Sequence, residues 1–277
     1  LAGRDLTGLH EHQLREIRGN EVAMIYQDPM TSLNPLMRVG EQVMEAMTAH
    51  GVPKAQARER MLDLLARVGI PDPRRTARAY PHEFSGGMRQ RVMIASALAM
   101  RPKLLIADEP TTALDVTIQQ QILALVDELR QELGMTTIWV THDLGVVARL
   151  VDRVVVMYAG HVVEDAPVRQ AFAAPQHPYT ASLLASLPDP NSDGRGRLAQ
   201  IPGRPPTSTE TVTGCPFRPR CAQARDICAV RPELLARPVP LSSAAATKAA
   251  GGGAAVAVAA EESITRVACH VPPAEWR

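Results

Sequence analysis

The chain of 277 residues is 45% hydrophobic and 21% charged, and its formal net charge is +1. Such a composition is typical of a globular protein with one large or two modest domains. The near-zero net charge and an aromatic content of 3% argue against a basic surface and against stacking rings, so we expect no nucleic-acid partner. No apolar run approaches the roughly 20 residues that span a bilayer. The chain begins with neither an initiator Met nor a signal-peptide pattern, so we expect a cytoplasmic chain whose first residue lies inside a domain.

The first predicted elements are one strand and two helices. Residues 21–26 form a short apolar run, predicted to be a buried strand that ends at Gln27, and a turn-rich loop follows over residues 28–35. Helices are predicted over residues 39–50 and 55–68. In the second helix the apolar residues recur at helical spacing, namely Ala57, Met61, Leu64, Leu65 and Val68.

The middle of the chain alternates helices and strands. A helix is predicted over residues 88–100, a continuous apolar strand over 104–107, an amphipathic helix over 117–133 and a further strand over 136–140. Gly134 is a natural stop for the amphipathic helix, since glycine readily adopts the left-handed conformation that ends helices. Strands that alternate with helices favour an α/β core with a parallel sheet.

The last third of the chain differs in character. Residues 154–158 and 161–164 are predicted to pair as a hairpin. Beyond residue 188 proline becomes frequent and apolar periodicity disappears. Residues 242–260 form an Ala/Gly tract, which we expect to be a flexible insertion.

Two adjacent carboxylates follow the apolar strand. Asp108 ends the run Leu104-Leu105-Ile106-Ala107, and Glu109 comes next. In open α/β sheets, ligands bind beyond the carboxyl ends of the strands. A carboxylate there can hold Mg²⁺ through its water shell, and a second one can orient and polarise an attacking water. A solvated acidic turn would explain the pair alone equally well, but the flanking sequence favours the functional interpretation.

Two further segments indicate phosphate binding. His142 follows the predicted strand 136–140 and should lie at the same sheet edge, where a neutral imidazole can hydrogen-bond a γ-phosphate. Ser85-Gly86-Gly87 precedes a helix, whose free N–H groups attract phosphate while the glycines allow close backbone approach. A structural histidine and a flexible helix entry are the alternatives for each segment alone. Their occurrence together with Asp108 and Glu109 favours the functional interpretation.

Taken in order, these segments resemble the motifs of ATP-binding cassette (ABC) ATPases. Phe84-Ser85-Gly86-Gly87-Met88-Arg89-Gln90-Arg91 resembles the signature motif. Leu104-Leu105-Ile106-Ala107-Asp108-Glu109-Pro110 resembles the Walker B strand with its catalytic Glu. Thr112-Ala113-Leu114-Asp115 resembles the D-loop, His142 the switch histidine and Gln27 the Q-loop glutamine.

Three features of the sequence resemble one branch of that family, the dipeptide, oligopeptide and nickel importers. The signature has Met88 where the general family usually has Gln, a departure familiar in this branch. The segment from Gln27 to Pro35 resembles the extended Q-loop of the branch. Gln176-His177-Pro178-Tyr179-Thr180, with the Cys-containing segments that follow, resembles its C-terminal extension. A soluble ABC protein of DNA repair or translation is disfavoured by these same segments.

The resemblance covers nearly the whole chain except the Ala/Gly tract, and it implies the fold. Across residues 1–187 we expect an α/β ABC-type nucleotide-binding domain, with a parallel sheet core and a helical signature subdomain over about 36–100. Residues 188–277 are expected to form a Cys-containing C-terminal extension that carries the flexible insertion.

The resemblance also implies roles for the site residues, with ATP and Mg²⁺ as ligands. Glu109 and His142 are expected to be catalytic, and Gln27 and Asp108 are expected to lie at the Mg²⁺ ion. In this family ATP lies between two nucleotide-binding domains, and the signature motif acts across the interface. The residues expected to bind nucleotide are therefore Gln27, Asp108, Ser85, Gly86, Gly87 and Asp115.

One expected motif does not occur in the sequence. The 277 residues contain no G-x-x-x-x-G-K-[ST] phosphate loop, and only 26 residues precede Gln27, whereas the family places this loop further upstream. The simplest expectation is an incomplete N-terminus. The alternative is a half-site subunit that lends its signature motif to a competent partner. By itself the chain is expected to bind ATP weakly, because the backbone N–H groups and the Lys of this loop hold the β- and γ-phosphates.

The four cysteines all lie late in the chain, at Cys215, Cys221, Cys228 and Cys269. In a cytosolic chain such a cluster favours metal binding over disulfides. The spacing C-x5-C-x6-C-x40-C lacks the C-x2-C knuckle of most zinc fingers, and four thiolates can hold a [4Fe–4S] cluster. The resemblance also implies this cluster, because the importer branch has one at similar cysteines. A four-thiolate Zn²⁺ site is the second interpretation and free thiols are the third. A structural role is favoured over a redox role.

The resemblance therefore implies an ATP-hydrolysing subunit that powers peptide import. Its expected partners are a second nucleotide-binding domain, two membrane permease subunits that dock at the Q-loop region and, indirectly, an extracytoplasmic substrate-binding protein. This assembly would place the chain peripherally at the cytoplasmic face of the cell membrane. The alternatives are the half-site subunit and an importer of nickel or another small solute, since the sequence does not identify the transported substrate.

Overall fold

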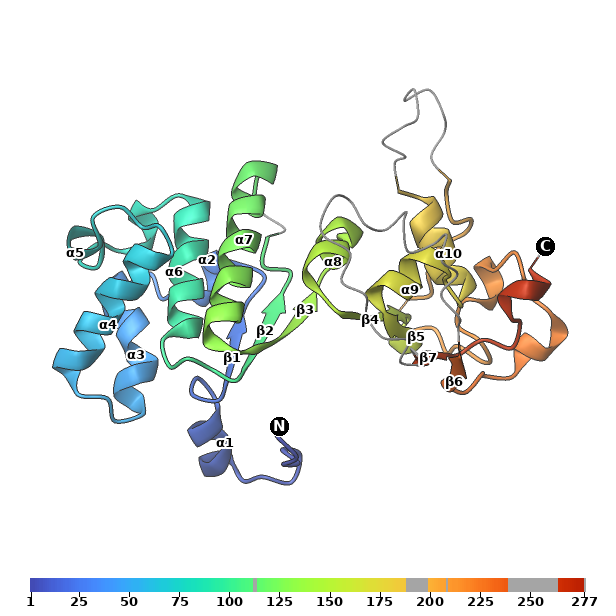
Figure 1. The fold of residues 1–277 in the computed structure, drawn as a ribbon, viewed down its shortest axis with the longest axis horizontal. Helices are drawn as coiled ribbons and strands as arrows, with labels where there is room; N and C mark the ends of the chain where they lie inside the picture. Colours follow the sequence, from blue (N-terminus) through green and yellow to red (C-terminus); the bar gives the residue numbers. More distant parts are fainter. Residues whose placement is uncertain (112–113, 188–198, 208, 239–263, 277) are drawn as a thin grey trace. The chain divides into compact units, whose positions relative to one another are not determined.

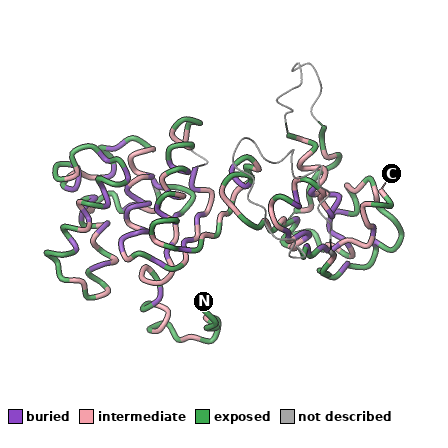
Figure 2. Tube along the Cα trace, in the orientation of Figure 1, coloured by how far each residue is buried: buried purple, intermediate pink, exposed green. Residues whose placement is uncertain are grey.

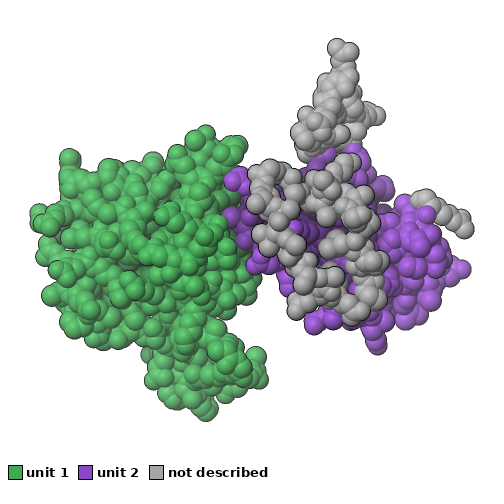
Figure 3. All heavy atoms as spheres, viewed as in Figure 1, with its two compact units in different colours: residues 1–143 green, residues 144–277 purple. Residues whose placement is uncertain are grey.

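The computed structural model describes all residues of the chain except 112–113, 188–198, 208, 239–263 and 277. Contacts within the chain divide it into two compact units, Leu1–Asp143 and Leu144–Arg277 (Figure 3). The Ala/Gly insertion expected at residues 242–260 lies outside the described residues.

The division between the units falls after Asp143, whereas the sequence predicted a domain boundary between residues 187 and 188. Strand pairing accounts for the difference. Strand β5 (His161–Pro167) pairs antiparallel with β7 (Ile264–Val267), so a segment near the C-terminus shares a sheet with the hairpin that precedes residue 188.

Unit 1 is built on a parallel sheet with the strand order β1-β2-β3 (Figure 1). The strands are β1 (Val22–Ile25), β2 (Leu104–Asp108) and β3 (Thr136–Val140). Their register pairs Met24 with Ile106, and Ile106 with Ile138. The parallel sheet predicted from the alternation of strands and helices is confirmed.

The helices of unit 1 are α1 (Glu11–Ile17), α2 (Pro29–Ser32), α3 (Val39–Ala49), α4 (Lys54–Arg67), α5 (Pro73–Thr76), α6 (Gly86–Leu98) and α7 (Val116–Leu133), with a 3₁₀ turn at Pro81–Glu83. One apolar core joins α3, α4 and α6 to the sheet, and Figure 2 shows the buried positions along these helices. Its fully buried members include Val43, Met47, Leu65, Ile94 and Leu105. The predicted helices over residues 39–50, 55–68, 88–100 and 117–133 are confirmed, whereas α1, α2 and α5 were not predicted.

Local sequence explains where the two helices nearest the candidate site begin and end. The Ser85 hydroxyl accepts a hydrogen bond from the backbone N–H of Met88 at 3.4 Å and caps α6. The Asp115 carboxylate accepts from the backbone N–H of Ile118 at 2.9 Å and caps α7. Gly134 ends α7 in the left-handed conformation, with φ of 62°, as expected for a glycine at a helix C-terminus.

The two faces of the parallel sheet differ in exposure. Leu105 and Ala107 of β2 are fully buried on the face that the helices cover, whereas Ile138 and Val140 of β3 are 49% and 47% exposed. Parallel strands are ordinarily covered on both faces. Among the described residues, β3 therefore has one face that is not covered.

Unit 2 is built on an antiparallel sheet with the strand order β4-β5-β7-β6. Its remaining elements are β4 (Arg153–Tyr158), β6 (Leu235–Pro238), α8 (Leu144–Leu150), α9 (Val168–Ala173), α10 (Pro178–Ala185) and 3₁₀ turns at Arg218–Arg220, Asp226–Ala229 and Pro273–Glu275. The predicted hairpin is confirmed, because β4 pairs with β5 across the turn at Ala159-Gly160. A small core of Tyr158, Val163, Phe217 and Val271 holds the C-terminal segments to this hairpin. None of the described helices is long and apolar enough to cross a membrane.

Candidate functional site

Three polar side chains meet at one edge of the parallel sheet. Gln27 follows β1, Glu109 follows β2 and His142 follows β3. Because these strands are parallel neighbours, their carboxyl ends lie at the same edge. The Gln27 side-chain amide donates to Glu109 Oε2 at 2.9 Å, and His142 Nδ1 lies 3.1 Å from Glu109 Oε1. The structure thus brings together three residues that the sequence predicted to share a site.

The backbone at Glu109 is held in an unusual conformation. Its φ is +42°, in the left-handed region, and its N–H donates to the carbonyl oxygen of Val140 at 2.8 Å. Non-glycine residues adopt this conformation at a cost, and such residues cluster at functional sites where the surroundings enforce the geometry. The hydrogen bond to β3 fixes the turn, so the Glu109 carboxylate is directed to the sheet edge.

The contact with Glu109 also sets which nitrogen of His142 carries a proton. A carboxylate only accepts hydrogen bonds, so Nδ1–H donates to it and the neutral ring has an unprotonated Nε2. The His142 side chain is 71% exposed and can therefore reach a ligand. Donation from Nε2 to a phosphate oxygen, as the sequence suggested, then requires the doubly protonated ring or release of the Glu109 contact.

Gln27 and Asp108, which were both expected at the Mg²⁺ ion, lie at the ends of adjacent strands. Asp108 is the last residue of β2 and is half-buried, in register with Val140. The Gln27 amide is bonded to Glu109 instead, and in the described residues no hydrogen bond joins it to Asp108. The two residues therefore lie at ends of adjacent strands, where both can face a ligand, without contacting each other.

The glycine-containing segment lies against the start of α7. A Cβ atom added at Gly87 would lie 3.1 Å from Ile118 Cγ2, whereas one added at Gly86 would meet no atom within 4 Å. The starts of α6 and α7 therefore pack together at Gly87 and Ile118, while the backbone at Gly86 stays open to an approaching ligand. Thr112 and Ala113 lie outside the described residues.

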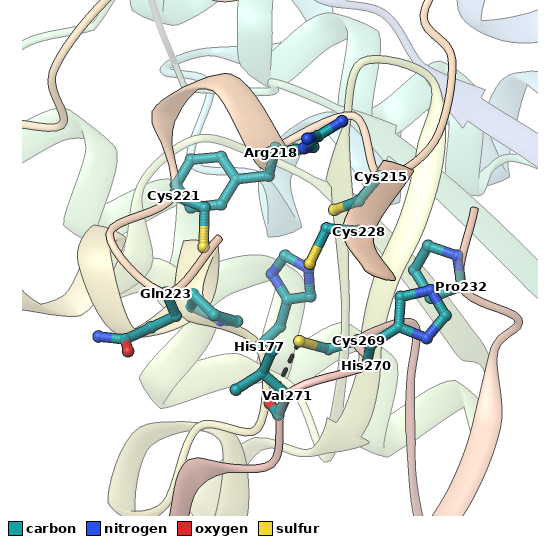
Figure 4. A pocket seen from close by; sticks show the side chains of 12 residues that line it. His177, Cys215, Arg218, Cys221, Gln223, Cys228, Pro232, Cys269, His270 and Val271 are labelled. Atoms are coloured by element: carbon teal, nitrogen blue, oxygen red, sulfur yellow. Dashed lines mark hydrogen bonds between the residues drawn. The ribbon is translucent and has the colours of Figure 1, made fainter. Parts of the chain in front are cut away.

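Unit 2 contains a second candidate site, which we call the thiol pocket. It is a cavity of about 10 Å³ whose lining includes Cys215, Cys221, Cys228 and Cys269. Figure 4 shows the four sulfur atoms directed toward its centre. All four cysteines are free thiols, two of them buried and two partly buried. The fold thus brings together cysteines that are widely separated in sequence.

Burial controls the protonation of these thiols. It raises the pKa of Cys221 to about 11 and raises the pKa of Cys215 and of Cys269 as well, and the neighbouring thiols add to each shift. The thiols are therefore neutral at physiological pH unless a cation stabilises the thiolates. No group of three or more His, Cys, Asp or Glu side chains within the described ranges is placed closely enough to hold a metal ion, so the expected iron–sulfur or zinc centre gains no support from these positions.

Two buried polar residues beside the thiol pocket were not predicted as site residues. Glu164 is 0% exposed, and its carboxylate accepts hydrogen bonds from the backbone N–H groups of Gln176 and His177, each at 2.9 Å. Burial raises the pKa of Glu164, and these hydrogen bonds partly oppose that effect. Burial lowers the pKa of His177 to about 4. The sequence signals were a charged residue inside an apolar strand and a His-Pro pair at a helix start.

Two protein families match this chain. Residues 1–112 match the family described as "ABC transporter". Residues 163–228 match the family described as "Oligopeptide/dipeptide transporter, C-terminal region". The first match includes Gln27, the glycine-containing segment and Glu109, and the second includes His177 and three of the four cysteines.

Curated relatives resemble the chain over most of its length. It is 52% identical over 244 residues to "Probable peptide ABC transporter ATP-binding protein y4tR" of Sinorhizobium fredii, which covers 88% of this chain and 73% of the relative. It is 53% identical over 235 residues to "Oligopeptide transport ATP-binding protein OppD" of Salmonella typhimurium, covering 84% and 70%. It is 53% identical over 227 residues to "Dipeptide transport ATP-binding protein DppD" of Escherichia coli, covering 82% and 69%.

Solved structures agree with this similarity. The chain superposes with a TM-score of 0.55 and 29% identity on "Dimeric structure of a post-hydrolysis state of the ATP-binding cassette MJ0796 bound to ADP and Pi", which covers 61% of this chain and 72% of that one. A second structure, "Dimeric Structure of MJ0796, a Bacterial ABC Transporter Cassette", superposes with a TM-score of 0.53 and 31% identity. This match covers 59% of this chain and 69% of that one. The α/β nucleotide-binding fold predicted from the sequence is confirmed.

Proposed function

This chain belongs to the ATP-binding proteins of ABC transporters, in the oligopeptide and dipeptide branch, and on that premise we propose that it hydrolyses ATP to power peptide import. The observation that carries the proposal is the Glu109 carboxylate, held at the sheet edge by Gln27 and His142 at 2.9 and 3.1 Å. A carboxylate fixed in this way can accept a proton from an attacking water and orient it.

We propose the following division of roles at the sheet edge. Glu109 polarises the water that attacks the γ-phosphate, and His142 contacts that phosphate. Asp108 and Gln27 would hold Mg²⁺, which would neutralise charge on the phosphates. Positioning of this kind supplies most of the catalysis in phosphoryl transfer, because the protein has little covalent chemistry to perform.

The glycine-containing segment is proposed to serve the ATP site of a partner. Its open backbone at Gly86 and the N-terminus of α6 suit a phosphate that approaches from outside the chain. A second nucleotide-binding domain would supply that phosphate. Ser85, Gly86, Gly87 and Asp115 would thus act across an interface.

We further propose the assembly in which the chain works. It would join a second ATPase and two membrane permeases on the cytoplasmic face of the membrane, with a substrate-binding protein on the other side. The relatives named above carry oligopeptide or dipeptide transport in their names, which favours peptides over nickel as the transported substrate.

Reconstitution of the complete transporter in vesicles tests this function. We expect uptake of labelled di- and oligopeptides that requires ATP and this subunit, with no uptake when Glu109→Gln replaces it. Uptake of nickel, with no peptide uptake, would reassign the substrate while leaving the ATPase role intact. ATP-independent peptide uptake would contradict the proposal.

We also propose that Cys215, Cys221, Cys228 and Cys269 hold a [4Fe–4S] cluster. The residue types fit, since four thiols line one pocket and four thiolates match the ligand count of such a cluster, although within the described residues these thiols are not arranged as a metal site. Burial raises the pKa of Cys221 to about 11, so a thiolate at this position needs a cation to stabilise it. The cavity of about 10 Å³ is only about large enough to hold one water molecule, so a cluster would require the thiol-bearing loops to separate.

Metal analysis of anaerobically purified protein tests the cluster. We expect about four iron and four sulfide per chain and a brown visible absorption, which Cys221→Ser should abolish. That variant should also make the C-terminal segments sensitive to protease while unit 1 stays folded. Stoichiometric zinc without iron would replace the cluster with a four-thiolate zinc site. Absence of metal, with all four thiols open to alkylation, would exclude both.

A further inference from the structure

We propose that the Nε2–H group of His177 donates a hydrogen bond to a sulfur atom of the metal centre in the thiol pocket, and that Glu164 positions it. This inference rests on the four-cysteine centre proposed above. His177 lines the same pocket as the four cysteines. Figure 4 shows its ring within the group of side chains that line the pocket.

The hydrogen bond at the other ring nitrogen fixes where the proton lies. The backbone N–H of Tyr179 donates to His177 Nδ1 at 3.1 Å, so Nδ1 is the acceptor and Nε2 carries the proton. His177 is 1% exposed. In the part of the chain that the structure describes, no protein group accepts a hydrogen bond from Nε2. Nε2 is not among the described buried atoms that lack a partner, so it keeps some exposure at the pocket, where a ligand can accept its hydrogen bond.

Glu164 holds the backbone that carries this ring. Its two carboxylate oxygens accept from the successive N–H groups of Gln176 and His177. Pro178, the first residue of α10, restricts His177 to extended backbone, and its φ and ψ are −111° and 134°. The strand, the carboxylate and the proline together determine the direction of the ring.

The other histidine at the pocket is engaged elsewhere. His270 Nε2 lies 3.1 Å from the carbonyl oxygen of Val230, which can only accept, so this N–H donates away from the sulfurs. His177 is therefore the imidazole available to the centre. Hydrogen bonds to thiolate and sulfide sulfur spread their negative charge, which raises metal affinity and reduction potential.

Two substitutions at the same position separate this role from a structural one. In His177→Asn the amide oxygen can replace Nδ1 as the acceptor for Tyr179, but no donor reaches the pocket. In His177→Gln the amide nitrogen can replace Nε2 as the donor. Gln176→Ala is the matched control, because Gln176 is the adjacent residue and its side chain donates to Ala174 rather than lining the pocket.

The full chain, purified anaerobically with its metal, is the material for the test. The measurements are the midpoint potential of the centre and the rate of metal loss to excess chelator. We expect His177→Asn to shift the midpoint to a more negative value and to speed metal loss about tenfold or more. His177→Gln and Gln176→Ala should stay close to the parent protein. Glu164→Gln, which replaces one acceptor oxygen, should change both measurements in the same direction as His177→Asn.

The possible failures are distinguishable. Equal behaviour of His177→Asn and His177→Gln, or parental values for His177→Asn, would overturn the hydrogen bond while leaving the metal centre in place. A parent protein that contains no metal would overturn the four-cysteine centre and this inference with it. If the parent contains zinc, the rate of metal loss decides, and the expected order of the variants is the same.

Discussion

The side-chain amide of Gln27 donates a hydrogen bond to the Glu109 carboxylate at 2.9 Å, although the two residues are 82 positions apart in sequence. His142 lies 3.1 Å from the other oxygen of that carboxylate. Each of the three parallel strands is thus followed by one residue that belongs to the same hydrogen-bonded group. The Glu109 carboxylate therefore connects the residue that follows β1 to the residue that follows β3.

We predict that Glu109→Gln lowers ATP hydrolysis by the assembled transporter at least ~100-fold, because a positioned general base contributes about 10²–10⁴ to the rate. The amide keeps the shape of the side chain but cannot take a proton from water. ATP binding should be preserved. Phosphate release and equilibrium nucleotide binding measure the two effects. Glu128→Gln, at an exposed position on α7, is the control, and parental turnover by Glu109→Gln would remove Glu109 from the catalytic role.

We predict that Gly86→Asp inhibits the ATP site of a partner subunit, whereas Gly86→Ala has little effect. A Cβ atom added at this position meets no atom within 4 Å, so we expect neither change to disturb the fold. A carboxylate about 4 Å from a phosphate charge costs about 4 kcal/mol at an effective dielectric constant near 20. The measurement is the ATPase rate of mixed complexes in which only the partner has an intact phosphate loop. Equal rates for the two variants would argue against donation of the segment across an interface.

We predict that the 277-residue chain by itself binds ATP weakly and hydrolyses very little. The sequence has no G-x-x-x-x-G-K-[ST] segment, and in this class of enzyme that loop holds the β- and γ-phosphates. Titration calorimetry with Mg-ATP measures the affinity. Tight binding with steady turnover would show that another segment holds the phosphates.

We predict that the free energy of unfolding of unit 2 falls as the pH drops from 6.5 to about 4. The pKa of His177 is lowered from 6.5 to about 4 by burial, so in this range the unfolded chain binds a proton that the folded chain excludes. The contribution of neutral His177 to the free energy of unfolding is complete above pH 6.5 and declines as the pH falls toward 4. This change in the pKa of His177 corresponds to at most about 3 kcal/mol in the free energy of unfolding.

The pH test needs a variant that removes the contribution of His177 alone. The raised pKa of Glu164 acts in the opposite sense, since its folded state binds a proton more readily and loses that stability as the pH rises. Denaturant unfolding of His177→Asn and of the parent protein at several pH values separates the two groups. The difference between the two proteins should grow as the pH rises from 4 to 6.5. A difference that is constant with pH would show that His177 is not buried in its neutral form.

The sequence alone determined the parallel sheet and the residues at its edge. Apolar runs end at Asp108 and at Val140, and a helix of regular periodicity lies between them. Local patterns of this kind depend on neighbours within a few residues, so the strands, the long helices and the helix stop at Gly134 could all be predicted. The placement of Glu109 and His142 at one edge then follows from the common direction of parallel strands.

Only the tertiary structure decided which side chains touch. The Gln27 contact goes to Glu109 and not to Asp108, and it depends on the left-handed backbone at Glu109, which no local pattern signals. The thiol pocket likewise requires β7 to pair with β5, which brings Cys269 to cysteines more than forty positions earlier. Sequence patterns determine local conformation through neighbouring residues. Contacts between distant segments depend instead on packing and on the burial of polar groups such as Glu164, and only the assembled fold defines these.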